Sequence, residues 1–370
     1  MRMKQLLATA ALIFFILPAC NSENLPLELI ELPPGFSIEL YADNLPDARS
    51  LALGANETVF VSTRNQGRIY ALRKDGDKTP KSYLIAKDLN TPNGIAFHQG
   101  DLYVATREQI LRYPDIERHL RKPPQPEVIA DGFPSDAAHG WRYLAIGPDD
   151  KLYVSIGAPC NICDRQGYAN IIRLNLDGSK REVFAHGVRN SIGFDWQPQT
   201  GEFWFTDNGR DMLGDDLPPD ELNHAPKSGM HFGYPYCHGR DIQDPEYGAG
   251  HDCSQYTPPA QELGPHVAAL GMRFYTGNQF PDSYKDSILI AEHGSWNRSE
   301  KIGYRITRVL LNERNEAIDY QPFASGWLQG DKAWGRPVDL LVMPDGSLLV
   351  SDDAAGVIYQ IRYREKNNDS

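Results

Sequence analysis

The stretch "LLVMPDGSLLVSDD", residues 340–353, indicates the fold of this chain. An apolar segment leads through a polar turn with proline and glycine into a second apolar segment, which is the pattern of two antiparallel strands. The same pattern recurs at residues 50–63, 94–106, 143–157, 193–207 and 280–294. Several copies are followed by a third apolar segment, such as "GVIYQIRY" at residues 356–363.

This repeat predicts an all-β fold, a six-bladed β-propeller. Six copies over roughly 340 residues give ~55 residues per blade, slightly more than the ~40–50 of common propeller repeats. Insertions account for the excess, and we expect the largest between Asp207 and Phe274. An irregular β-sandwich is the alternative. We expect one propeller domain at residues 35–365, with the inner strand ends converging on one face where a site should lie.

Composition limits the class of partner. The chain has 370 residues, of which 49 are acidic and 37 basic, giving a formal net charge of −12. It contains no dense lysine and arginine cluster, so we expect no nucleic-acid partner. A hydrophobic content of 41% with 10% aromatic residues is enough for a packed core.

The N-terminus resembles an export signal. Residues 1–20 combine a basic start, an apolar run too short to span a bilayer, and the ending "LPAC", which resembles a lipobox. We therefore predict a lipoprotein-type signal peptide, with lipidation of Cys20, a tether at 21–34 and a tail at 366–370. The prediction is an exported protein of the bacterial periplasm, attached to a membrane only through this lipid. An ordinary signal peptide cleaved near Ala19 is the alternative.

Export favours disulfides. Besides Cys20 the chain contains four cysteines, Cys160, Cys163, Cys237 and Cys253, which allow three pairings. Pairing near neighbours closes the shortest loops. The "CNICD" segment lacks the histidine of c-type haem attachment, and it does not open the helix that a redox Cys-x-x-Cys normally opens. A zinc site remains an alternative, built from Cys237, His238, His251 and Cys253.

Polar, cationic and aromatic residues gather at equivalent positions of the repeat. They are His139, Arg142, His186, Arg189, Asn190, Asp207, Asn208, Gly209, Arg210, Glu292, His293, Trp296, Asn297, Arg298, Lys332, Trp334 and Arg336. Arginine binds carboxylates and phosphates bidentately, so this set indicates a ligand with several anionic groups. Tryptophan can stack on a flat ring, and His139 is the best candidate for a general base.

The acidic segment "TDNGRDMLGDDLPPDELN", residues 206–223, is not an EF-hand, because its acidic residues do not follow the spacing of that loop. Backbone carbonyls and a ligand's own oxygens could still hold a hard cation here. Gly209 allows close approach of the backbone.

These motifs resemble the quinoprotein sugar dehydrogenases of the soluble aldose/glucose and sorbosone dehydrogenase type. The resemblance rests on "HGWRYLAIGPDDKLYVSIG", "TDNGRD", "DELNH", "EHGSWNRS" and "GRPVDLLVMPDGSLLVSDD" and covers nearly the whole chain after residue 34. It implies a six-bladed propeller that uses pyrroloquinoline quinone (PQQ) and Ca²⁺ to oxidise a small sugar, an aldose or related sugar aldehyde. Electrons would then pass to a separate acceptor such as a cytochrome c or a membrane quinone.

The resemblance also implies roles for individual residues. His139 would act as the base, and Arg189 would stabilise the developing oxyanion. Gly209 and Arg210 would bind calcium through their main-chain carbonyls. The cofactor-binding set would be Arg142, Asn190, Asn208, Asp220, Trp296, Arg298 and Arg336.

The chain departs from the family in two places. The acidic residue that supports the catalytic histidine in the glucose branch is missing, since "IGAPCNIC" contains no acid before Asp164. Asp136 is a possible substitute. The lysine that accompanies the cofactor has no clear match, although Lys332 is a candidate.

Two other functions compete with the dehydrogenase. One is a calcium-dependent lactonase or esterase of the same fold, which would use Asp207, Asn190 and Asn297 on an axial metal. The other is a non-enzymatic binding propeller.

Overall fold

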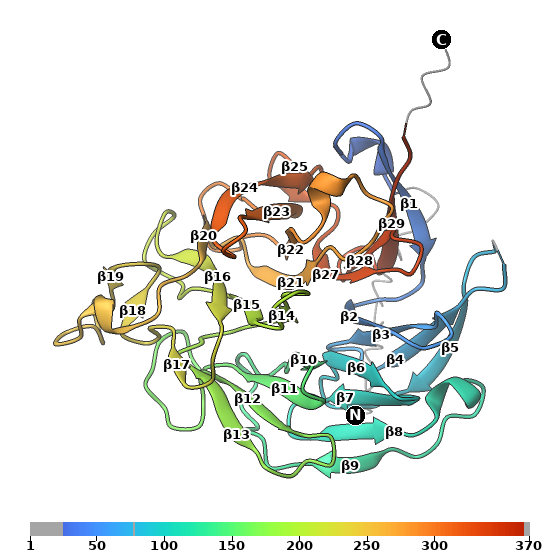
Figure 1. Cartoon of the computed structure of the whole chain (residues 1–370), viewed down its shortest axis with the longest axis horizontal. Coiled ribbons are helices and arrows are strands. Elements are labelled where there is room, and N and C mark those ends of the chain that lie inside the picture. Colours follow the sequence, from blue (N-terminus) through green and yellow to red (C-terminus); the bar gives the residue numbers. More distant parts are fainter. Residues whose placement is uncertain (1–24, 77, 366–370) are drawn as a thin grey trace, which may run out of the picture.

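The computed structural model describes residues 25–76 and 78–365, whose main strands form six β-sheets of four or five strands arranged around a central axis (Figure 1). The predicted six-bladed β-propeller is therefore confirmed. The described residues contain short 3₁₀ turns and no α-helix. Within them, no helix is long and apolar enough to cross a membrane.

We number the blades I to VI in chain order of their inner strands. Blade I consists of β2 (Ala48–Leu53), β3 (Val59–Thr63), β4 (Ile69–Arg73) and β5 (Lys81–Ala86). Blade II consists of β6 (Gly94–His98), β7 (Asp101–Ala105), β8 (Ile110–Tyr113) and β9 (Glu127–Ala130). Blade III consists of β10 (Leu144–Ile146), β11 (Lys151–Ile156), β12 (Asn170–Asn175) and β13 (Glu182–His186), with β17 (Met230–His231) added in parallel.

Blade IV consists of β14 (Gly193–Trp196), β15 (Phe203–Asp207), β16 (Pro219–Ala225) and β20 (Gln261–Pro265). Blade V consists of β21 (Ala269–Phe274), β22 (Ile288–Glu292), β23 (Arg305–Leu311) and β24 (Ala317–Ala324). Blade VI consists of β27 (Pro337–Val342), β28 (Leu348–Asp352), β29 (Val357–Tyr363) and β1 (Phe36–Ala42).

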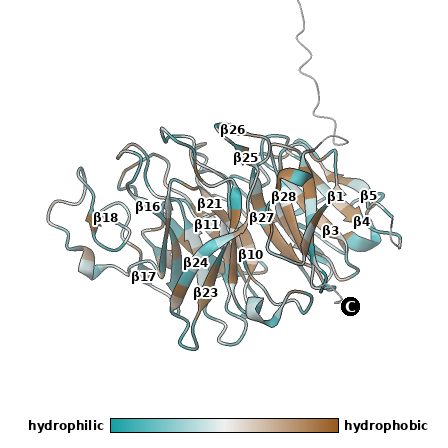
Figure 2. Cartoon of the chain, turned by 90° about the horizontal axis from the view of Figure 1, so that it is seen from above, coloured by the Kyte–Doolittle hydropathy of each residue, from teal (hydrophilic) through white to brown (hydrophobic). Residues whose placement is uncertain are grey.

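The second strand of each blade is buried on both faces, which explains the apolar runs of the repeat. Strands β3, β15, β22 and β28 are buried throughout, whereas the fourth strands β5, β9 and β13 are mostly exposed. The buried apolar side chains form clusters that lie between neighbouring blades; Val61 of blade I, for example, packs with Leu349 of blade VI. Figure 2 shows the hydrophobic residues concentrated in the strands and the hydrophilic ones in the loops.

The ring is closed by the two ends of the chain. Strand β1 is the outermost strand of blade VI and pairs antiparallel with β29, with Phe36 opposite Tyr363 and Leu40 opposite Tyr359. Phe36 also packs against Phe280, with 4.7 Å between the ring centroids, and against Phe323 of blade V. The N-terminal strand therefore joins the last blade to the rest of the ring.

The segment expected to be a tether is partly folded, which corrects that prediction for residues 25–34. It contains the 3₁₀ turn η2 (Leu27–Leu29), and Glu31 forms a β-bridge with Ser325. The reason is apolar content, because Leu27 and Ile30 pack against the core cluster of blades V and VI. The predicted signal peptide (1–20) with Cys20, residues 21–24 and the tail at 366–370 lie outside the described residues.

The expected insertion lies between β16 and β20 of blade IV. It holds β17, the hairpin of β18 (Cys237–His238) and β19 (Ile242–Gln243), and the turn η4 (Cys253–Gln255). A second small hairpin, β25 (Leu328–Gln329) with β26 (Lys332–Ala333), precedes blade VI. The turns η3 (Ile116–Arg118) and η5 (Asp282–Tyr284) lie in other loops.

The cysteines pair as near neighbours, Cys160 with Cys163 and Cys237 with Cys253. The zinc alternative is therefore wrong, because both of its thiols are used. Its histidines also have protein partners: His238 Nε2 lies 2.9 Å from Asp244 and His251 Nδ1 lies 2.7 Å from the Tyr256 hydroxyl. Among the described residues, no group of acidic, histidine or cysteine side chains is arranged to hold a metal ion.

The closure of the ring predicts that Phe36→Ala destabilises the whole propeller. Truncating this ring removes its contacts with blade V and loosens β1, so we expect a loss of about 3 kcal/mol in the free energy of unfolding. Chemical denaturation measures this value. Leu84→Ala on the exposed face of β5 is the control, with an expected change below about 0.5 kcal/mol. Equal effects of the two variants would show that closure by β1 contributes little.

Candidate active site

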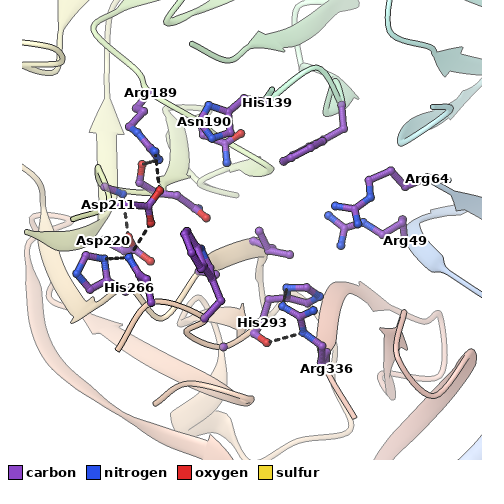
Figure 3. A pocket seen from close by; sticks show the side chains of 18 residues that line it. Arg49, Arg64, His139, Arg189, Asn190, Asp211, Asp220, His266, His293 and Arg336 are labelled. Atoms are coloured by element: carbon purple, nitrogen blue, oxygen red, sulfur yellow. Dashed lines mark hydrogen bonds and ion pairs between the residues drawn. The ribbon is translucent and has the colours of Figure 1, made fainter. Parts of the chain in front are cut away.

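A cavity of about 290 Å³ lies where loops of blades I, III, IV, V and VI meet (Figure 3). It is lined by Arg49, Arg64, His139, Trp141, Arg189, Asn190, Asn208, Gly209, Asp211, Asp220, His266, Ala268, Leu270, His293, Gly294, Trp296, Asn297 and Arg336.

Strand pairing explains why these loops meet. In blade I the first residue of β2, Ala48, pairs with the last residue of β3, Thr63. In blade V the first residue of β21, Ala269, pairs with the last residue of β22, Glu292. The loop that enters each inner strand and the loop that leaves the second strand therefore lie at the same end of the propeller.

Most of the sequence-predicted site residues line this cavity. They are His139, Arg189, Asn190, Asn208, Gly209, Asp220, Trp296 and Arg336. The Trp296 side chain is 66% exposed, which is unusual for a large aromatic residue and leaves one wall of the cavity able to cover a flat ligand. The buried side-chain oxygens of Asn190 and Asn297 have no hydrogen-bond partner among the described residues.

Arg142 and Arg298, which were predicted to bind the cofactor, do not line the cavity. Buried Arg142 donates to the main-chain carbonyls of Arg107 (3.1 Å) and Pro134 (2.6 Å). Arg298 donates to the main-chain carbonyls of Glu300 and Asp215. Both arginines brace loops.

The side chain of Arg210 also points to protein partners, at 2.6 Å from Asp244 and 2.8 Å from Glu246. The prediction for this residue and for Gly209 concerns their main-chain carbonyls. Neither carbonyl accepts a hydrogen bond within the described part of the chain. Lys332 and Trp334 lie outside the cavity; Lys332 is exposed, and Trp334 donates to the Gly326 carbonyl.

His139 is held by a carbonyl instead of a carboxylate. Its Nδ1 lies 2.7 Å from the main-chain oxygen of Ala158, which can only accept, so Nδ1 carries the proton and donates it. The opposite nitrogen, Nε2, is left with its lone pair. Burial, with a contribution from nearby Arg189, lowers the pKa of His139 from 6.5 to about 3, so the ring is neutral.

The loop around His139 depends on a glycine. A Cβ added at Gly157 would lie 2.6 Å from the His139 Cβ, closer than any stable contact, so the end of β11 can approach the histidine only with glycine at this position. Asp136 does not support His139. It accepts from Tyr168 and lies 3.2 Å from Arg165.

Arg189 uses most of its donors to join two loops. Nε and Nη2 donate to the main-chain and side-chain oxygens of Asn161, at 2.9 and 2.8 Å. Nη1 donates to the Asn208 carbonyl, and Nη2 also pairs with Asp211 at 3.0 Å. A guanidinium has five N–H groups, so at most one remains for a ligand.

Buried carboxylates hold the backbone beneath the cavity. Asp207 accepts from the main-chain N–H groups of Arg189 (2.8 Å) and Asn190 (2.6 Å). Asp220 accepts from Gly209 at 2.8 Å and from Ala269 at 3.3 Å. Burial raises the pKa of Asp207 and of Asp220 to about 7. Because both oxygens of Asp207 are used in this way, the geometry does not favour the lactonase alternative, which needed that carboxylate on a metal.

The opposite wall carries a charged network that joins blades I, V and VI. Arg336 donates to Nδ1 of His293 at 2.8 Å, so His293 Nε2 bears the proton that it donates to Asp353 at 2.8 Å. Asp353 also pairs with Arg49 at 2.9 Å. Burial lowers the pKa of His293 to about 4. The neighbouring His293 and Arg49 side chains hold the pKa of Asp353 well below its usual range.

Sequence reasoning missed several lining residues, among them Arg49, Arg64, Trp141 and His266. Arg49 and Arg64 flank the first copy of the repeat, where no motif drew attention. A signal was present for Arg49, because a charged residue at the start of the apolar strand "ARSLAL" needs a buried partner.

The fold and cavity define a class, the six-bladed propellers with an arginine-rich ligand site on the axis. The sequence matches the family described as TrAA12-like over residues 30–364, and the chain belongs to this family. It is also 34% identical over 351 residues to an uncharacterised protein of Borreliella burgdorferi, a match that covers 91% of each chain.

Known structures share this fold. A structure of the carbohydrate-active enzyme family AA12 from Trichoderma reesei has a TM-score of 0.80 and 19% identity, over 90% of this chain and 98% of that one. The PQQ domain of pyranose dehydrogenase from Coprinopsis cinerea has a TM-score of 0.76 and 19% identity, over 90% and 97% of the two chains. The family match confirms the resemblance to quinoprotein sugar dehydrogenases, and these structures share its fold.

Burial, aided by nearby Arg189, predicts that His139 stays neutral at pH values where an exposed histidine is charged, and its hydrogen bond to Ala158 predicts that its proton is on Nδ1. Its folded-state pKa of about 3 lies below its unfolded value, so the folded state binds fewer protons under pH 6.5. The stability that a neutral His139 contributes is therefore complete above pH 6.5 and is lost as the pH falls toward 3.

Comparison with His139→Gln isolates this contribution. Below pH 6.5 we expect the wild type to lose up to about 1.4 kcal/mol per pH unit more than the variant in the free energy of unfolding. Denaturation between pH 4 and 8 measures this difference, and ¹⁵N NMR reports the tautomer. A difference that does not change with pH would contradict the assignment.

Proposed function

We propose that this protein is a quinoprotein dehydrogenase that oxidises an aldose or related sugar by hydride transfer to PQQ. The observation that carries the proposal is a neutral histidine, with a free Nε2 lone pair, in a cavity whose other walls are rich in arginine. The family match supports it, as does the description of the Coprinopsis cinerea protein as a PQQ-dependent pyranose dehydrogenase. That protein is 30% identical over 125 residues, 28% of this chain and 16% of its own length.

The cavity fits PQQ, a flat molecule with three carboxylates. Arg336 and Arg49 supply positive charge on one wall, and exposed Trp296 can cover a planar ring. The side-chain oxygens of Asn190 and Asn297 lack partners and can accept from a ligand. We also place Ca²⁺ with the cofactor, on the carbonyls of Gly209 and Arg210, because these oxygens have no other partner and hard cations prefer oxygen ligands.

When bound, PQQ supplies an electrophilic quinone carbonyl that takes up a hydride. The chain supplies the base. His139 Nε2 accepts the proton of the sugar hydroxyl, while Ala158 keeps the other nitrogen protonated and the ring oriented. Arg189 fixes the loops around Asn161 and Asp211, and its remaining N–H faces developing negative charge. Asp220 holds Gly209 in place through the main chain.

The remaining parts of the proposal extend beyond the cavity. The substrate is a small sugar, and the electrons pass to a separate acceptor such as a cytochrome c or a membrane quinone. We further propose export to the bacterial periplasm and attachment through a lipid on Cys20, on the basis of the sequence of residues 1–20.

Reconstitution tests the proposed function. Purified protein should oxidise aldoses in a dye-linked assay only after addition of PQQ and Ca²⁺, and a chelator should abolish the activity. We expect His139→Gln to lower kcat by about 10²- to 10⁴-fold, the usual contribution of a general base, while the Kd for PQQ changes little. His186→Gln is the control, because His186 is exposed and outside the cavity.

Three results would contradict the proposal. Lactone hydrolysis without PQQ would favour the lactonase alternative. Sugar binding without turnover in the presence of PQQ would favour a binding propeller. An unchanged kcat in His139→Gln would remove the base from the mechanism.

A further inference from the structure

One cation of the cavity wall has no counter-ion. Arg64 follows β3 and lines the cavity, and no carboxylate of the described residues lies within the 4.0 Å of an ion pair with its guanidinium. Its buried Nε has no hydrogen-bond partner either. Arg49 and Arg189, by contrast, are each paired with an aspartate, and Arg336 donates to His293.

This arrangement costs free energy in the protein alone. A partly buried guanidinium without a counter-ion loses hydration that nothing replaces. The neighbouring Arg49 adds repulsion, and both effects lower the pKa of Arg64. Figure 3 shows the two arginines together on the wall opposite Arg189 and Asp211.

The backbone of Arg64 is nevertheless held firmly. The carboxylate of Asp47 accepts from the main-chain N–H groups of Arg64 (3.0 Å) and Gln66 (3.1 Å), and also from that of Asn65. Among the described residues, Asp47 is the only acid hydrogen-bonded to this loop, and it binds the main chain. The loop presents the guanidinium to the cavity without neutralising it.

Trp141 places this cation beside the candidate base. The Arg64 guanidinium lies over the Trp141 ring, 5.0 Å from its centroid, and the same ring meets His139 edge-on at 5.9 Å. A cation–π contact orients a guanidinium but leaves its N–H groups free for an acceptor. The Trp141 ring therefore lies between the unpaired guanidinium of Arg64 and the His139 ring, and it contacts both.

We propose that Arg64 binds a carboxylate of the small-molecule ligand, on the Trp141 side of the cavity. Guanidinium and carboxylate match in charge and in bidentate geometry. A bound carboxylate would therefore supply the counter-ion that Arg64 lacks. The carboxylate comes either from the quinone cofactor or from an acidic sugar such as a uronate, and this choice of sources rests on the proposed function.

Arg64→Gln tests the proposal, with Arg68→Gln as the matched control, because Arg68 is an exposed arginine of the same hairpin outside the cavity. We expect Arg64→Gln to keep or raise the Tm of the ligand-free protein, since it removes an unpaired cation. Arg49→Gln should lower the Tm, because it leaves Asp353 buried without its arginine.

Two measurements, the affinity for PQQ and kcat/KM for two sugars, identify the source of the carboxylate. A loss of tenfold or more in PQQ affinity, measured with Ca²⁺ present, assigns the carboxylate to the cofactor. An unchanged PQQ affinity with a tenfold or greater loss in kcat/KM for glucuronate relative to glucose assigns it to the substrate. If wild-type protein does not bind PQQ, calorimetric titration of the protein alone with glucuronate and with glucose still tests Arg64. Only the binding of glucuronate should then be weaker in Arg64→Gln than in the wild type.

The proposal is overturned if Arg64→Gln lowers the Tm as much as Arg49→Gln does, since Arg64 would then serve the fold. It is also overturned if the variant binds PQQ and glucuronate as tightly as the wild type and Arg68→Gln do.

Discussion

The closure of the ring between blades I and VI is the constraint on which the rest of this structure depends. On the outside, β1 joins β29 and completes blade VI. On the axis, Arg49 of blade I pairs with Asp353, which follows β28 of blade VI, across 304 residues of sequence. The first contact completes blade VI with the N-terminal strand, and the second crosses the seam between blades I and VI. Because Arg49, Arg64 and Arg336 lie on either side of it, the shape of the cavity and the closure of the fold depend on the same interactions.

The cavity combines a high density of arginine with neutral histidines. Main-chain and side-chain partners set the tautomers: Ala158 fixes the proton of His139 on Nδ1, and Arg336 and Asp353 fix that of His293 on Nε2. Burial keeps both rings uncharged. A neutral imidazole beside fixed positive charge suits the proposed role of His139, which is to remove a proton while negative charge develops nearby. The carboxylate support expected for His139 is unnecessary, because a carbonyl performs the same orientation.

The acidic segment at residues 206–223 contributes mainly through its backbone. Asp207 and Asp220 are buried and accept main-chain N–H groups, so they shape the loop around Gly209. Asp211 pairs with Arg189 and accepts from Asn297, linking blades IV and V. Asp216 is 89% exposed and lies 3.5 Å from Arg298. The carboxylates of this segment thus position other groups, and what the segment itself leaves available to a ligand are the main-chain oxygens of Gly209 and Arg210.

The sequence by itself determined the propeller and much of its active face, because each blade is a local repeat of apolar strands and turns whose ends must converge. It also identified His139, Asn190, Gly209 and Arg336, which lie in dense motifs at those ends. Only the tertiary structure decided which guanidinium groups face the axis. Arg142 and Arg298 turn to main-chain carbonyls of their own and neighbouring loops, whereas Arg49 and Arg64 enter the cavity from blade I. The physical reason is that the direction of a long side chain beyond a strand end depends on which partners the folded chain brings near it, and for Arg49 that partner is 304 residues away.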